Sequence, residues 1–242
     1  MDIIKKLAQE LAIKEEQAKA AVQLIDEGNT IPFIARYRKE MTGALNDETL
    51  RNLHERLLYL RNLEEKKEQV INAITDQGKM TEDLKKKILS AETLVAVDDL
   101  YRPYRPKKQT RATKAKEKGL EPLANILLLQ KTTKSMEEEA AAFVNAEKGV
   151  ANAKEAIAGA KDIIAEMIAD MADYRKSIRN CTMKQGSLVV KAKDEKAESV
   201  YEMYYDFREP LSKVTGYRVL AINRGEKEKF LTVKVEAPDV QI

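Results

Sequence analysis

A seam of apolar positions in the stretch 46–77 constrains this chain more than any other feature. The positions alternate in steps of four and three, which is the spacing of one face of an α-helix. They are Leu53, Leu57, Leu60, Glu64, Lys67, Ile71 and Ile74. Asn46 or Asp47 is suited to cap the amino terminus of such a helix. We therefore predict one long helix that runs to about Gln77 and carries two charged positions in its apolar face.

A seam of this length has to be covered by other residues. A second long helix is predicted over residues 150–179, and Gly159 would let a neighbouring helix approach it closely. Its stripe consists of Ala153, Ile157, Ala160, Ile164, Met167, Met171, Tyr174 and Ile178. An isolated two-stranded coiled coil would also show the first seam. We favour an intramolecular antiparallel pair, in which residues 53–74 pack against residues 150–179.

Composition favours a mainly α fold. Hydrophobic residues make up 43% of the chain and charged residues 34%, with only nine glycines, which is typical of long helices. After about Cys181 the pattern changes to short β-branched runs at 187–191 and 230–235, with helices predicted between them at 196–205 and 214–224. We predict helical hairpins and long antiparallel helices, followed by a small carboxyl-terminal α/β subdomain.

These patterns suggest three parts. Residues 1–45 are predicted to form a helical hairpin followed by an ordered connector, because residues 30–43 mix apolar and basic side chains without clean periodicity. Residues 46–180 would be the bundle of long helices, with a basic loop at 101–118, and residues 181–242 the α/β subdomain.

The positive charge is concentrated in the basic loop. Residues 102–118 contain eight basic residues and one acidic residue, a net charge of +7, whereas the whole chain carries +3. The rest of the chain is therefore net negative. Attraction to a polyanion should be local to this segment.

The basic loop is the candidate nucleic-acid site. Pro103 and Pro106 favour an extended, polyproline-like backbone that would turn the neighbouring side chains outward. Arginine binds phosphate through two nitrogens, and tyrosine stacks on bases. The candidate binding residues are Arg102, Arg105, Lys107, Lys108, Arg111 and Lys114. In the alternative interpretation, Tyr101 and Tyr104 pack on neighbouring helices and the cations meet acidic surfaces.

Residues that commonly carry catalysis are sparse. A single histidine, His54, and a single cysteine, Cys181, provide neither an internal disulfide nor a thiolate metal cluster or triad. Asp98 and Asp99 are adjacent, but successive helical side chains point about 100° apart, so we expect solvated or salt-bridged acids. Glycine-rich phosphate loops are absent from the sequence. We expect no enzymatic activity, cofactor, metal or small-molecule substrate.

Targeting signals are equally sparse. Residues 1–10 alternate charged and aliphatic side chains, and no uninterrupted apolar run in the sequence approaches the length of a membrane span. We expect a cytoplasmic protein without a membrane partner.

Three stretches of the chain resemble the Tex family of bacterial transcription accessory proteins. They begin at Ile31 (IPFIARYRKE), at Asp99 (DLYRPYRPKKQTRA) and at Glu209 (EPLSKV), and the last resumes at Tyr217 (YRVLAINRG). They occur in the family's order and span nearly the whole chain.

The resemblance implies a multidomain protein related to a eukaryotic elongation factor that chaperones histones. Its RNase H-like, helix-hairpin-helix and OB-fold RNA-binding domains would follow the residues present here, and most nucleic-acid binding would be expected from them. This chain would then be an amino-terminal scaffold that associates with RNA or DNA without sequence preference. The alternative is a helical protein-interaction module that docks on other domains or on the transcription machinery.

Overall fold

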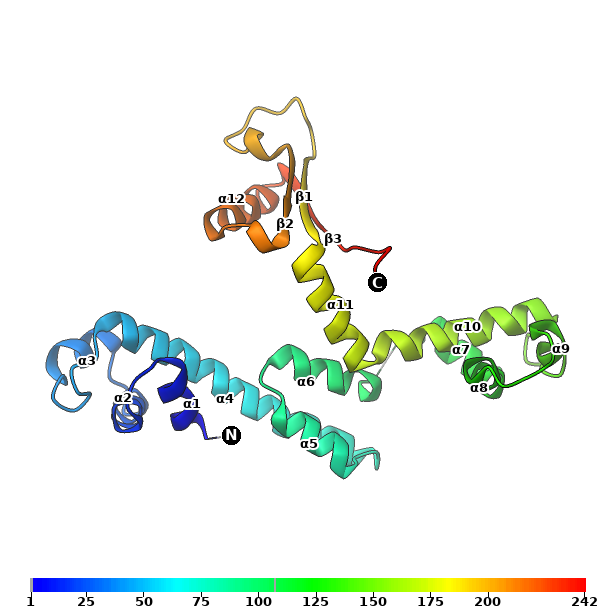
Figure 1. The fold of residues 1–242 in the computed structure, drawn as a ribbon, viewed down its shortest axis with the longest axis horizontal. Helices are drawn as coiled ribbons and strands as arrows, with labels where there is room; N and C mark the ends of the chain where they lie inside the picture. Colours follow the sequence, from blue (N-terminus) through cyan, green and yellow to red (C-terminus); the bar gives the residue numbers. More distant parts are fainter. Residues whose placement is uncertain (1, 107) are drawn as a thin grey trace. The chain divides into compact units, whose positions relative to one another are not determined.

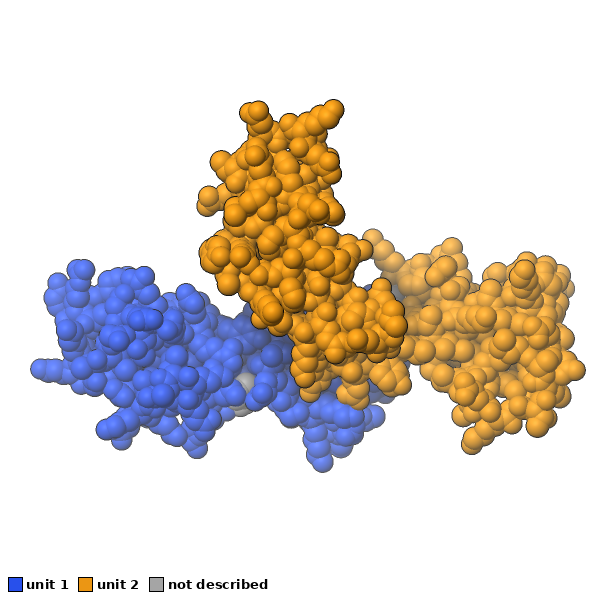
Figure 2. Space-filling view, turned by 45° about the horizontal axis from the view of Figure 1, so that its top comes forward, with its two compact units in different colours: residues 1–106 blue, residues 107–242 orange. Residues whose placement is uncertain are grey.

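The computed structural model describes residues 2–106 and 108–242 (Figure 1). Over these residues the fold is mainly α, with a small antiparallel sheet near the carboxyl terminus, which confirms the predicted fold class. The chain divides into two compact units, unit 1 (residues 1–106) and unit 2 (residues 107–242), coloured separately in Figure 2. The finer division at residues 45 and 180 stays a prediction.

The predicted long helix is α4 (Asp47–Asp76), and Asn46 caps it by accepting a hydrogen bond from the Thr49 amide at 2.7 Å. Its buried positions are Leu50, Leu53, Leu57, Leu60, Leu63, Lys67, Val70 and Ile74. The seam was predicted to pass through Glu64 and Ile71, but the fully buried positions are one residue earlier. The seven-residue repeat itself is kept, because Leu53, Leu60, Lys67 and Ile74 are all buried. The apolar Leu63 and Val70 take the positions between them, since helical residues three and four apart share a face.

Short helices of unit 1 cover the α4 seam. The first half of α4 packs against α1 (Ile3–Glu10), α2 (Glu15–Asp26) and α3 (Ile31–Tyr37), and the second half against α5 (Glu82–Ser90) and α6 (Leu94–Tyr101). Because α3 lies within residues 30–43, the connector predicted there is partly helical. Pro32 occupies the first turn of α3, where a missing amide hydrogen leaves no helical hydrogen bond unmade.

Lys67 is a charged residue inside this seam, and only 2% of it is exposed. Its ammonium donates to Glu64 Oε1 at 2.8 Å and to the Leu89 carbonyl in the last turn of α5 at 2.9 Å. Burial would raise the pKa of Glu64, but the hydrogen bond from Lys67 acts in the opposite direction, and that pKa lies below its ordinary value. Lys67 thus satisfies a carbonyl that the end of a helix leaves unpaired, and it holds α5 against α4.

Two arginines of α4 hold the amino-terminal hairpin in place. Arg56 donates to both carboxylate oxygens of Glu10, at 2.5 and 2.8 Å, and Arg61 donates to both oxygens of Asp26, at 2.7 Å each. Such two-point pairs restrict orientation more than a single contact does. They fix α1 and α2 relative to α4.

Acidification is expected to weaken unit 1 through these pairs. The hydrogen bonds from Arg56 and Arg61 lower the pKa of Glu10 and of Asp26 below their ordinary values of 4.5 and 3.8. A carboxyl whose pKa is lower in the folded state than in the unfolded state contributes its full stabilisation at pH values above the unfolded-state pKa. This stabilisation is lost as the pH falls through the folded-state pKa. Glu10→Gln should lower stability at neutral pH by about 0.2 to 1 kcal/mol and reduce the further loss on acidification. Thermal melts at neutral pH and near pH 3 measure both effects, and an unchanged acid sensitivity in Glu10→Gln would contradict this assignment.

In unit 2, the helix α10 (Ala153–Asp170) packs against α7 (Arg111–Glu117), α8 (Glu121–Leu129) and α9 (Met136–Ala141). A Cβ atom placed on Gly159 of α10 would lie 2.4 Å from Leu120 Cδ1 and 3.3 Å from the Ala115 Cβ. Gly159 therefore permits a close approach, as predicted, but the element that approaches is α7 with its following turn.

The second predicted long helix is interrupted. Met171 has φ −71° and ψ 117°, which ends α10, and α11 (Ala172–Gln185) follows. Ala156, Ile157, Ala160 and Ile163 are buried, but the end of the predicted stripe is exposed: Met167, Met171, Tyr174 and Ile178. The predicted packing of the α4 seam on the 150–179 stripe is wrong, because the buried part of each is covered by short helices of its own unit. Residues close in sequence lose less entropy on meeting than distant ones.

The α/β subdomain is an antiparallel sheet with strand order β2-β1-β3 and the helix α12 (Gly216–Lys227). The strands are β1 (Ser187–Ala192), β2 (Asp206–Pro210) and β3 (Leu231–Glu236). Val190 pairs with Phe207 on one side and with Val233 on the other, and it is fully buried.

Two details of this subdomain differ from the prediction. The segment 196–205 contains only the 3₁₀ turn η2 (Glu202–Tyr204) instead of a helix, and β2 was not predicted. β2 is an edge strand of mostly charged residues that ends at Pro210, so it lacks the β-branched run by which a strand is recognised in sequence.

Candidate nucleic-acid interface

The beginning of the basic segment belongs to unit 1 and is anchored there. Arg102–Tyr104 form the 3₁₀ turn η1, and Gln77 Nε2 donates to the Tyr104 carbonyl at 3.0 Å. Tyr101 and Tyr104 are half-buried against the cluster around Leu63, Val70 and Ile74. The extended conformation predicted for this segment is therefore wrong over Arg102–Tyr104, whereas Arg105, with φ −65° and ψ 132°, is extended. Its tyrosines pack on helices, as the alternative interpretation holds, because apolar rings beside an open cluster gain more from burial than from exposure.

The charge of Arg105 is paired within unit 1. Its Nη2 donates to Asp98 Oδ1 at 2.9 Å, and its guanidinium lies 5.5 Å from the centre of the Tyr101 ring. Asp98 also lies 3.7 Å from the Lys66 ammonium, while the neighbouring Asp99 is buried. Asp98 is thus salt-bridged, as expected. Arg102 is exposed.

The later candidates belong to unit 2, where the predicted loop becomes helical. Thr110 caps α7 by accepting from the Thr113 amide at 3.0 Å, and its hydroxyl donates to Glu166 Oε1 on α10 at 3.0 Å. Ala112 and Ala115 face the core of this unit. Because helical residues three or four apart share a face, Arg111 and Lys114 are turned away from that core together.

The five described candidate residues are divided between the two units. Arg102 and Arg105 lie in unit 1, whereas Lys108, Arg111 and Lys114 lie in unit 2 and are exposed. Lys107, the remaining candidate, lies outside the described residues.

Lys118 and Lys148 join this basic surface and were not among the predicted site residues. Lys118, at the end of α7, donates to the Gly149 carbonyl at 2.8 Å. The Lys148 ammonium lies 3.7 Å from the point where a Cβ on Gly119 would be. Each glycine has a positive φ, 80° for Gly119 and 70° for Gly149. Two Lys-Gly turns thus lie against each other, and the repeated Lys-Gly pair is the sequence signal that could have revealed them.

A pocket of about 260 Å³ opens beside α7. Arg111, Lys114 and Lys118 contribute its positive charge, and Glu155 and Asp162 of α10 contribute its negative charge. Asp162 lies 3.4 Å from Arg111, and Glu155 Oε2 accepts from the Ala151 amide at 2.9 Å. Within the described part of the chain, Lys114 and Lys118 form no ion pair. We call Arg111, Lys114 and Lys118 the α7 basic face.

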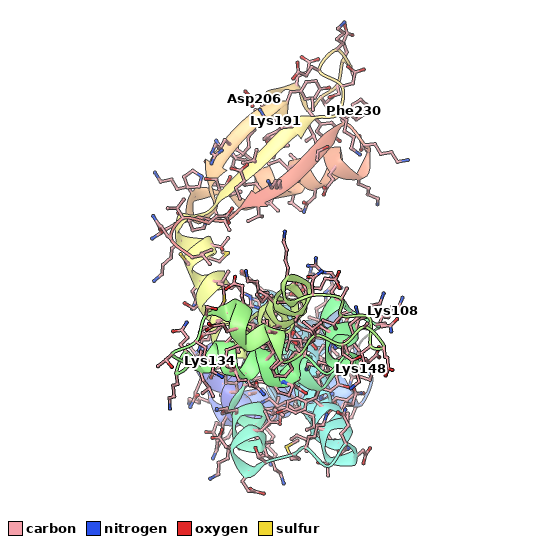
Figure 3. The ribbon with its side chains drawn as sticks, turned by 90° about the vertical axis from the view of Figure 1, so that its right-hand side faces the viewer. Lys108, Lys134, Lys148, Lys191, Asp206 and Phe230 are labelled. Carbon is pink, nitrogen blue, oxygen red and sulfur yellow. The ribbon has the colours of Figure 1, made fainter. Side chains whose placement is uncertain are left out.

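Two cations on the open side of the sheet are paired with acids. Lys191 and Asp206, labelled in Figure 3, contact each other across β1 and β2. Arg208 pairs with Glu236 at 2.9 Å. Since these cations are neutralised by neighbouring acids, the sheet is a weaker candidate for a polyanion than the α7 basic face.

Among residues 2–106 and 108–242, no three His, Cys, Asp or Glu side chains lie close enough to hold a metal ion. The same residues contain no helix that is both long and apolar enough to cross a membrane.

Comparison with known proteins assigns both ends of the chain to one family. Residues 1–75 match the Tex-like protein N-terminal domain, and residues 131–242 match the Tex central region-like family. These matches define a chain built from the amino-terminal and central regions of Tex-like proteins.

Similar proteins occur in bacteria and in animals. The chain is 44% identical over 235 residues to the uncharacterized protein YdcI of Bacillus subtilis and 41% identical over 239 residues to the transcriptional accessory protein Tex of Neisseria gonorrhoeae. It is 33% identical over 248 residues to S1 RNA-binding domain-containing protein 1 of Homo sapiens. The alignments cover 96%, 98% and 98% of this chain, but 33%, 31% and 24% of the respective relatives. The chain belongs to the Tex family, and it spans at most about a third of the length of these relatives.

Proposed function

We propose that this chain is the amino-terminal scaffold of a Tex-like transcription accessory protein, and that unit 2 contacts nucleic acid through the α7 basic face. The observation that carries the proposal is the exposed cationic face itself, on which Lys114 and Lys118 form no ion pair with any described residue. One relative is named a transcriptional accessory protein and another is named for an S1 RNA-binding domain, which supports a role around nucleic acid. Contacts of this kind are made to phosphates, so RNA and DNA would bind without sequence preference.

The contribution of this chain to binding is proposed to be secondary. Most binding would come from parts of the longer protein that lie outside this sequence, and the units described here would hold those parts and add phosphate contacts. Arg105 would add little, because Asp98 already neutralises it. The protein would act in the cytoplasm, without catalysing a reaction itself.

A protein-interaction module is the second candidate function, and one observation favours it. No residue of α11 is buried, and its side chains Tyr174, Ile178 and Met183 are 48%, 42% and 57% exposed. Apolar side chains that remain open in this way suit contact with another protein surface. This candidate requires neither nucleic-acid binding nor the α7 basic face, so one set of titrations separates the two.

Removal of charge around α7 is expected to flatten the salt dependence of nucleic-acid binding. In the triple variant Arg111→Gln, Lys114→Gln, Lys118→Gln, the log–log slope of affinity against salt should become shallower by up to about 2, since each lost phosphate contact on a single strand contributes about 0.7. Folding should be largely retained, because exposed cations contribute little to stability. Titrations of a labelled single-stranded RNA and a single-stranded DNA at two salt concentrations measure this slope.

The matched control removes the same charge elsewhere in unit 2, by Lys131→Gln, Lys134→Gln and Lys184→Gln together. All three lysines are exposed, and Lys134 lies at the opposite edge of the helical part from Lys108 and Lys148 in Figure 3. The control should bind nearly as wild type does. Equal losses in both variants would mean that only net charge matters, and binding that is unchanged in both would remove the proposal in favour of the interaction module.

A further inference from the structure

The pocket beside α7 is too small for a complete ligand of drug size but large enough for part of a polymer. Its volume is about 260 Å³, whereas sites for drug-sized molecules span roughly 300 to 1,000 Å³. It is open on one side, because the exposed Ala158 and Gly149 belong to its lining. A single unit of a longer chain could enter it while the neighbouring units remain in solvent.

The charged lining favours an anion. Arg111, Lys114 and Lys118 stand at helical spacing along α7 and its end, so their charges converge on one side of the pocket. The Lys118 ammonium donates one of its three hydrogens to the Gly149 carbonyl, which leaves two donors for a ligand. Of the two acids in the lining, Asp162 is near Arg111 and Glu155 is engaged by a backbone amide. The cations therefore exceed the acids by one within the lining.

Four of the uncharged residues that line the pocket are small. Ala115, Ala158, Gly149 and Gly159 all line it, so a ligand can come close to the main chain. A larger residue at position 159 would displace Leu120. Gly149 has a φ of 70°, which residues with a Cβ atom rarely adopt. The uncharged lining offers no polar side chain that would distinguish one base from another, so its chemistry suits the sugar and phosphate that all nucleotides share.

We propose that this pocket binds one sugar-phosphate unit of a single-stranded nucleic acid, with the phosphate at Lys114 and Lys118 and the sugar over Ala158 and Gly159. This deepens the proposed function and rests on it. A flexible strand can turn one unit into a recess, whereas a rigid duplex presents its backbone only to the rim. A free nucleoside monophosphate carries the same chemistry, and the test distinguishes it from a strand.

The test fills the pocket without changing its charge. Ala158 is exposed, so Ala158→Leu adds volume inside the pocket while the fold and the cations stay in place. The affinity for a labelled oligouridylate, measured by fluorescence anisotropy, should fall about tenfold, the loss expected for a contact to a charged group. Lys114→Gln should lower affinity as well and make the salt slope shallower by about 0.7. Lys116→Gln, which removes the same charge from the same helix but outside the pocket lining, should have a smaller effect on affinity.

The outcomes separate this inference from the proposed function. If the triple charge variant loses binding while both Ala158→Leu and a second filling variant, Ala158→Gln, bind as wild type, the pocket inference is overturned and the proposed function stands. If the wild-type chain binds no nucleic acid at all, both fail. A duplex of the same length should bind more weakly and respond less to Ala158→Leu, and an equal response would overturn the assignment to a single strand. Uridine monophosphate should compete only at far higher concentrations than the strand, and equally strong competition would assign the pocket to a free nucleotide instead.

Discussion

Replacement of Lys67 by alanine is expected to destabilise unit 1 by about 2 to 5 kcal/mol, the cost of truncating a long side chain in a packed core. Lys67 is 2% exposed and supplies the hydrogen bonds to Glu64 and to the Leu89 carbonyl. Its removal leaves a carbonyl at the end of α5 without this donor, takes one hydrogen bond from Glu64, and opens a cavity in the core. Chemical denaturation monitored by circular dichroism measures the free energy of unfolding.

Two further variants show whether charge or volume is responsible. Lys67→Met keeps most of the volume and loses the donor, so it should cost about 1 to 3 kcal/mol, the penalty for an unsatisfied buried polar group. Lys66→Ala is the matched control, because Lys66 is the neighbouring residue, is partly exposed and lies 3.7 Å from Asp98. It should change stability by less than about 1 kcal/mol. If Lys67→Met were as stable as wild type, the ammonium would have no part in holding α5.

Truncation of the α4 seam is expected to have the second large effect. Leu60 is fully buried in the cluster that α1, α2 and α3 form on α4. Leu60→Ala should cost about 2 to 5 kcal/mol, because it removes buried methyl groups and leaves a cavity that the surrounding helices fill only in part.

Leu58 provides the control for this truncation, since it belongs to the same helix and is 55% exposed. Leu58→Ala should change stability by no more than about 0.5 kcal/mol, as for other surface positions. Denaturation curves of the two variants, recorded with wild type, give the difference directly. Equal effects of the two changes would contradict the assignment of the seam to the core.

The candidate site was only partly predictable from sequence. The excess of positive charge in residues 102–118 is visible without a structure, and it directs attention to Arg111 and Lys114. Lys148 cannot be found in the same way, because it comes 30 positions after Lys118 and joins the site through the bridge between Asn145 and Val150. The pocket also depends on Gly159 and Asp162 of α10. These residues lie next to α7 only because α10 packs against α7 in the folded chain.

The basic segment shows why charge alone does not define a surface. Arg105 and Lys114 look equivalent in sequence, yet Arg105 faces Asp98 while Lys114 lines an open pocket. Whether a cation is neutralised depends on acids that folding brings near it, and Asp98 comes seven residues before Arg105 on the preceding helix. The prolines of the segment indicated an extended backbone, but Pro103 sits equally well in the first turn of η1.

The sequence by itself determined the mainly α class, the extent and cap of α4, the buried half of the α10 stripe and the start of the sheet region. These follow from local periodicity and capping, which depend on residues within one or two helical turns. Only the tertiary structure decided which elements cover each seam, where α10 ends, and which cations share the α7 basic face. An apolar stripe indicates that a helix face must be buried, but it does not indicate which element covers that face. Hydrophobic burial is non-directional, so any apolar surface of matching shape can cover it.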